Sequence, residues 1–88
     1  MNRYLLAGML NDYGRALLKS KPSEAAVAFT RAVDITTKAM LEAPSWVELL
    51  RERARAYWGL GDVEHAGADW ADVRKRSPLN RRYLEARQ

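Results

Sequence analysis

Few side chains in this 88-residue sequence have the chemistry that catalysis requires. His65 is the sole histidine and there are no cysteines, so an acid, base or metal site would have little to draw on. Glu48 and Glu52 have helical spacing, which indicates a solvated helix face paired with arginines. The same holds for Asp69 and Asp72. The sequence therefore predicts a protein that is not an enzyme and holds no metal ion or cofactor.

Two arginines and a tryptophan share one face of a predicted helix. Arg51, Arg55 and Trp58 stand at positions i, i+4 and i+7, so their side chains project together. Guanidinium groups beside an aromatic ring bind carboxylates through paired hydrogen bonds and stack on planar groups. The alternative is structural: Glu48 and Glu52 neutralise these arginines, and Trp58 packs against the next helical hairpin.

A second concentration of positive charge lies near the end of the chain. Residues 74–88 carry six basic side chains and one acidic side chain, whereas residues 1–73 have a net charge of −1. The basic patch comprises Arg74, Lys75, Arg76, Arg81 and Arg82. Such a stretch predicts salt-dependent binding of nucleic-acid phosphates. The alternative is that these charges complement a helix dipole and give the last helix a charged outer face.

Prolines and a glycine–aspartate pair divide the chain into helices. Each of the three prolines stands beside a serine that can cap a helix, and Ser45-x-x-Glu48 has the spacing of a capping box. Gly61-Asp62 provides a further stop and start. Apolar residues recur at three- and four-residue intervals without period-two alternation, which predicts antiparallel helices and no strands. The expected helices span residues 3–19, 22–43, 46–60, 63–76 and 78–87.

One order of side chains occurs twice: small, aromatic, then small or aliphatic. The two sets stand 41 residues apart and comprise Ala25, Phe29, Ala32 and Ala66, Trp70, Val73. Around the second set, residues 54–66 and Pro78 resemble the tetratricopeptide repeat (TPR) family, with its glycine–aspartate turn between helices A and B. The resemblance implies an all-α array of stacked antiparallel hairpins in a single domain, residues 1–88. Its parts are unit one (3–43), unit two (45–77) and a capping helix (78–88).

The resemblance also implies a binding groove, and two features depart from the family. In TPR proteins the first helix of each hairpin lines the concave groove, which adds Asn11 and Arg15 to the candidate site. The 41-residue spacing exceeds the usual repeat of about 34 residues. Arg53 stands where the family keeps an apolar residue, so that side of the stack is expected to be solvated or paired with a carboxylate. The aromatic residues expected to pack in the core or between hairpins are Phe29, Trp46, Tyr57 and Trp70.

The function expected from these patterns is protein binding. An adaptor, scaffold or co-chaperone-like module would bind another protein through an acidic peptide in the groove, with Asn11, Arg15, Arg51, Arg55 and Trp58 as its contacts. The alternatives are a nucleic-acid accessory protein using the basic patch, and a structural oligomerisation module. Two repeats are fewer than a stable stack usually needs, so we expect a homodimer, a longer array, or an exposed face covered by the two extra turns of the helix that begins near Pro22. No apolar run reaches membrane-spanning length, and we expect a cytoplasmic protein.

Overall fold

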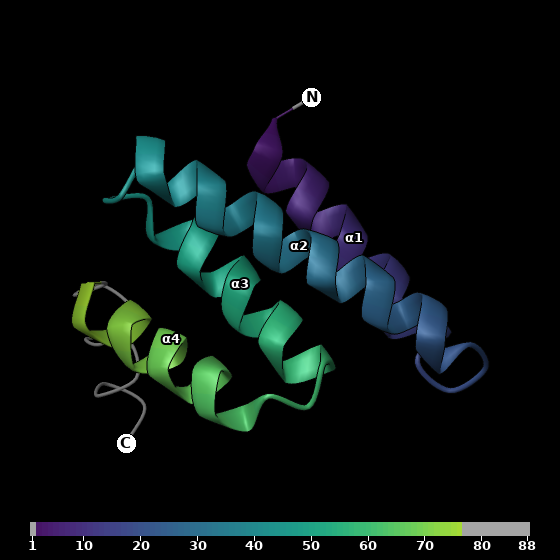
Figure 1. Ribbon diagram of the computed structural model, residues 1–88. Helices are drawn as coiled ribbons and strands as arrows, with labels where there is room; N and C mark the ends of the chain where they lie inside the picture. The colour runs from purple at the N-terminus through teal and green to yellow at the C-terminus, as the bar shows by residue number, and fades with distance from the viewer. Residues whose placement is uncertain (1, 77–88) are drawn as a thin grey trace, which may run out of the picture.

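The chain folds into four α-helices in the computed structural model, which describes residues 2–76. The helices are α1 (Arg3–Leu17), α2 (Pro22–Glu42), α3 (Val47–Gly59) and α4 (Val63–Arg76). The described residues contain no strand, which confirms the all-α prediction (Figure 1). The fifth helix, predicted at residues 78–87, lies outside the described residues. Within residues 2–76, no helix is long and apolar enough to cross a membrane.

The helix ends follow local capping chemistry, although the capping box at Ser45 was a wrong prediction. The side chain of Asn2 accepts a hydrogen bond from the Tyr4 backbone N–H at 2.8 Å, and Pro22 occupies the first turn of α2. Gly61 takes a φ of 78°, a conformation that favours glycine, between α3 and α4. No side chain caps α3, because its N-cap residue is Trp46 and Ser45 lies one position too early.

Successive helices form two hairpins that share one core. α1 packs on α2, α2 on α3 and α3 on α4, and α1 also packs on α3 (Figure 1). The Phe29 ring from α2 is fully buried, and it fills the space left by Gly14 of α1 and Gly59 of α3. A Cβ atom at Gly14 would lie 2.8 Å from this ring. Small residues at the helix crossings therefore let three backbones close around one aromatic side chain.

A bidentate ion pair holds α4 against α3. The Nε and Nη2 atoms of Arg53 donate to the two carboxylate oxygens of Asp69, each at 2.8 Å. The hydrogen bond to Asp69 raises the pKa of Arg53 above its usual value despite partial burial. Arg53 is therefore paired with a carboxylate, one of the two outcomes expected from the sequence. Asp69 is buried, so the prediction of a solvated Asp69/Asp72 face was wrong for Asp69.

Removing the Asp69 carboxylate is expected to destabilise the α3–α4 hairpin strongly. The Asp69→Ala variant leaves Arg53 without its carboxylate partner, and we expect a loss of about 2 kcal/mol in the free energy of unfolding. Asp72→Ala is the matched control, because Asp72 pairs with Arg76 at 3.3 Å where both side chains are partly exposed. That pair should contribute less than about 0.5 kcal/mol. Urea unfolding followed by circular dichroism compares the two variants, and equal losses would contradict the prediction.

Candidate functional site

A buried polar network joins α1 to α3. The Asn11 side chain is fully buried, and its Nδ2 donates to the backbone oxygen of Glu52 at 2.9 Å and to Glu52 Oε1 at 3.0 Å. The Glu52 residue is only 7% exposed. The carboxylate lies beside Gly8, where a Cβ atom would be 3.9 Å from it, an ordinary van der Waals distance. The solvated face predicted for Glu48 and Glu52 was therefore wrong for Glu52, which lies where α1 crosses α3.

Arg55 extends this network to the protein surface. Its Nη1 donates to Glu52 Oε1 at 2.8 Å, and its Nη2 donates to Asp12 Oδ1 at 2.7 Å. Partial burial lowers the pKa of Arg55, but the hydrogen bonds and charges of Asp12 and Glu52 outweigh burial and raise it. Because two carboxylates compensate one guanidinium, Arg55 fixes the spacing of α1 and α3 and adds little positive charge to its surroundings.

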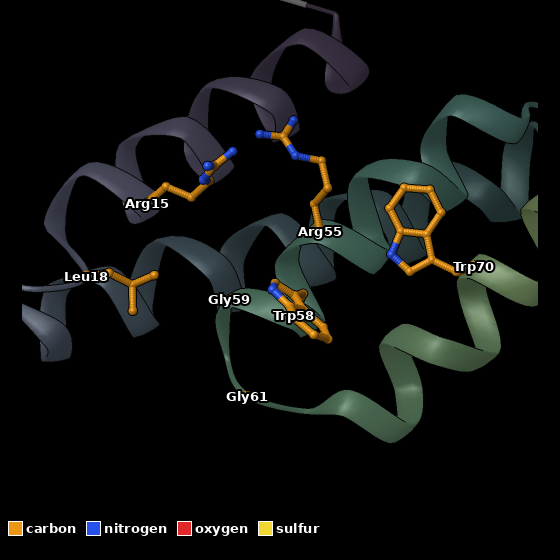
Figure 2. Close-up of a pocket in the computed structure, with 7 residues that line it drawn as sticks. All are labelled: Arg15, Leu18, Arg55, Trp58, Gly59, Gly61 and Trp70. Atoms are coloured by element: carbon orange, nitrogen blue, oxygen red, sulfur yellow. The ribbon is translucent and has the colours of Figure 1, made fainter.

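A cleft of about 630 Å³ opens beside this network, between α1, α3 and the turn that leads to α4. Its lining combines basic, aromatic and small side chains: Arg15, Leu18, Arg55, Trp58, Gly59, Gly61 and Trp70. Figure 2 shows Arg15 on α1 and Arg55 on α3 along one side, with Trp58 below them and Trp70 reaching in from α4. Trp58 is 65% exposed, an unusual position for an indole that only supports packing.

Arg15 differs from Arg55 in its electrostatic surroundings. No carboxylate within residues 2–76 forms an ion pair with Arg15, whereas Arg55 has two such partners. The Arg15 side chain is exposed and lies on the cleft wall that α1 contributes. An anion that enters the cleft would therefore meet an uncompensated guanidinium at Arg15 and a compensated one at Arg55.

The cleft contains three of the five residues predicted for the groove. Arg15, Arg55 and Trp58 line it. Asn11 does not, because its side chain is fully buried against Glu52, which corrects its assignment as a peptide contact. Arg51 lies on the same helix face by sequence spacing, but it is not part of the cleft lining.

Four lining residues were not assigned to the groove from the sequence: Leu18, Gly59, Gly61 and Trp70. Trp70 was expected to pack between hairpins, yet it is half-buried and borders the cleft. Leu18 follows the last residue of α1, and no spacing pattern had indicated it. Of the other aromatic residues, Phe29 is buried as predicted, while Trp46 lies at the surface against Tyr4, with ring centroids 5.4 Å apart. The predicted burial is therefore confirmed for Phe29, whereas the sequence pattern did not separate core positions from surface and cleft positions.

The described part of the basic patch lies at the end of α4. Arg74, Lys75 and Arg76 are exposed in the last turn, where their charges complement the helix dipole. Arg76 also donates from Nη1 to the Pro44 backbone oxygen at 2.8 Å. Arg81 and Arg82, the other members of the predicted patch, lie outside the described residues.

His65 supports the turn between α3 and α4. Its backbone N–H donates to Asp62 Oδ1 at 3.1 Å, and its Nδ1 lies 2.7 Å from Asp62 Oδ2. The backbone hydrogen bond, with a smaller contribution from the side chain, lowers the pKa of Asp62. The exposed imidazole stacks on Tyr57 with ring centroids 5.0 Å apart. Among residues 2–76, no three histidine or acidic side chains lie close enough together to hold a metal ion.

Comparisons with known proteins give no further guide to this cleft. No protein-family model, curated protein or solved structure matches the chain.

Proposed function

We propose that this chain is a non-catalytic protein-interaction module built as a TPR-like array of two stacked hairpins. The order of packing supports this architecture, since α1 contacts α3 as well as α2, and α4 contacts α3. The glycine–aspartate turn between α3 and α4 and the small residues around Phe29 support it too. In such an array, α1 and α3 are the first helices of the two hairpins, and they line one surface together.

The ligand that fits this surface is a peptide segment with a carboxylate next to an apolar side chain. The observation that carries the proposal is the cleft itself, in which Arg15 lies opposite the exposed indole of Trp58. The guanidinium of Arg15 can bind a carboxylate through two parallel hydrogen bonds. The indoles of Trp58 and Trp70 offer an apolar surface beside it, and tryptophan and arginine are the residues most enriched at binding hot spots.

Arg55 has a different role from the one expected of it. Both terminal nitrogens of its guanidinium are already engaged with Asp12 and Glu52, so it holds α1 and α3 at the distance that defines the cleft. Arg15 is then the principal anion contact, and the cleft selects one acidic group rather than an acidic run. With one available guanidinium in a mainly apolar cleft, a single carboxylate in the ligand can contribute to specificity.

The experiment is a selection from a peptide library followed by measured affinities. The library consists of peptides of about eight residues, which reach about 26 Å when extended, and each carries one Asp or Glu beside Leu, Phe or Trp. The Arg15→Glu variant should weaken the selected peptides by at least about tenfold, because it replaces an ion pair with repulsion. Trp58→Ala should weaken them by a similar factor and remove the preference for a large apolar neighbour. Fluorescence polarisation with labelled peptides measures both effects.

Arg51→Glu provides the matched control. Arg51 is on the same helix as Arg55, it has no ion-pair partner within residues 2–76, and it does not line the cleft. Its charge reversal should change the affinities by less than about twofold. Peptides that bind Arg15→Glu and the wild-type chain equally well, or that respond only to Arg51→Glu, would contradict the proposal.

The two other functions expected from the sequence remain predictions. Nucleic-acid binding would depend on the basic patch at the end of α4, and the Arg76 side chain there already pairs with Asp72 and hydrogen-bonds Pro44. Recovering the native ligand with and without nuclease separates this function from peptide binding, since only phosphate-driven capture should be both nuclease-sensitive and steeply salt-dependent. A purely structural module would select no peptide for the cleft.

A further inference from the structure

The α1–α2 hairpin has a second exposed surface, separate from the cleft. A shallow groove of about 260 Å³ runs between the two helices, lined by Leu10, Tyr13, Glu24, Val27, Ala28 and Arg31. We call this surface the end face, because α3 and α4 follow in order from the other side of α2 (Figure 1). Val27 is 62% exposed at its centre, and Met9 and Tyr13 of α1 are also largely exposed. None of the lining residues belongs to the peptide cleft.

The charges on the end face are arranged symmetrically about its apolar centre. Glu24 and Arg31 are seven residues apart, which is about two helical turns, so they lie on one side of α2. The midpoint between them falls between Val27 and Ala28. Neither charge forms an ion pair with any residue of the described chain. The face therefore presents a negative group, an apolar centre and a positive group in line along one helix.

The charge pattern of α2 is complementary to that of a second α2 running in the opposite direction. An interface between identical copies related by a twofold axis must place each group opposite its own complement. A second α2 running antiparallel, with the axis between Val27 and Ala28, places Glu24 opposite Arg31 of the second copy and Arg31 opposite Glu24 of the second copy. The exposed Val27 then meets Val27 of the second copy beside the axis, while Ala28 is buried beneath it.

We propose that the end face is the interface of a twofold-symmetric homodimer, in which the α2 helices pack antiparallel. The two Glu24–Arg31 pairs fix the register, and the apolar centre provides the buried area together with Tyr13 from each copy. The peptide cleft lies on different residues and stays open in the dimer, so each dimer presents two clefts. The proposal does not depend on what the cleft binds.

Charge exchange tests the interface directly. Sedimentation equilibrium of the wild-type chain should give about twice the monomer mass of 10.0 kDa. Glu24→Arg alone, or Arg31→Glu alone, places like charges together at two symmetric points and should raise the dimer dissociation constant about tenfold or more. The double variant Glu24→Arg/Arg31→Glu exchanges the signs and should restore dimerisation. Circular dichroism verifies that all three variants keep their helices.

Cysteine cross-linking gives an independent readout of the axis. The chain has no cysteine, so a single Val27→Cys substitution near the axis should form an intermolecular disulfide under mild oxidation. Val63→Cys is the matched control, since Val63 is 61% exposed on the far hairpin and Val27 is 62% exposed. It should cross-link much more slowly.

Three outcomes would overturn the proposal. The first is a monomeric wild-type chain at millimolar concentration, which would leave the end face to another protein. The second is a double charge-exchange variant that is helical but does not recover the dimer. The third is equal cross-linking at Val27 and Val63.

Discussion

Replacing Gly59 with alanine is expected to lower the free energy of unfolding by about 2 to 3 kcal/mol. An added Cβ atom would lie only 2.5 Å from Cε1 of Phe29, closer than non-bonded carbon atoms approach in proteins. The ring cannot move aside freely, because it is fully buried and packs with Ala25, Ala32 and Ala56. The helix propensity gained by alanine, about 1 kcal/mol, does not offset this overlap. Urea unfolding followed by circular dichroism measures the loss.

Gly67→Ala separates this steric effect from helix propensity. Gly67 lies in the middle of α4, and a Cβ atom there would meet nothing within 4 Å. The same chemical change should therefore stabilise the protein by about 0.5 to 1 kcal/mol. If alanine lowers the free energy of unfolding at position 59 and raises it at position 67, Phe29 fills the space at Gly59. A Gly59→Ala variant as stable as the wild type would mean that the ring does not lie between α1 and α3.

The positions of the helices could be predicted from the sequence because their limits depend on local chemistry. Pro22 begins α2, and Gly61 with Asp62 separates α3 from α4, as expected from the left-handed φ of glycine and the capping carboxylate of aspartate. The other described ends fall within one residue of the expectation, and the one error of two residues occurred where the end lacks such a signal. The expected helix 3–19 ends at Leu17, where no glycine or proline follows directly.

The candidate cleft could be predicted only in part, because helical spacing gives a shared face and not what covers it. Spacing correctly grouped Arg55 with Trp58. It could not show that α1 crosses α3 at Glu52 and buries that carboxylate with Asn11, since this depends on the rotation of one helix against another.

The buried polar network of Asn11, Glu52 and Arg55 is also a place where changing a single atom should strongly lower the free energy of unfolding. Asn11→Asp replaces the donor Nδ2, which lies 3.0 Å from Glu52 Oε1, with an oxygen. Two buried carboxylates at that distance cannot both ionise cheaply, so we expect the variant to lose about 3 kcal/mol of unfolding free energy at pH 7. The Asn11 Oδ1 atom has no hydrogen-bond partner among the described residues. No neighbouring donor is therefore in place at this position to stabilise the introduced carboxylate.

The loss from Asn11→Asp should depend on pH with a defined sign. Repulsion raises the folded-state pKa of the introduced carboxyl above its unfolded value of about 3.9. The unfolded state therefore releases its proton first as the pH rises. Below about pH 4 the variant should have nearly the wild-type free energy of unfolding, and the difference should grow progressively toward neutral pH. Asn2→Asp makes the same change at the exposed N-cap of α1, where the backbone N–H of Tyr4 and the helix dipole favour a carboxylate. Above about pH 4, the free energy of unfolding of Asn2→Asp should equal or exceed that of the wild type. Unfolding curves from pH 3 to 8 distinguish the two profiles, and a pH-independent difference between Asn11→Asp and the wild type would mean that the carboxylate of Glu52 does not face position 11.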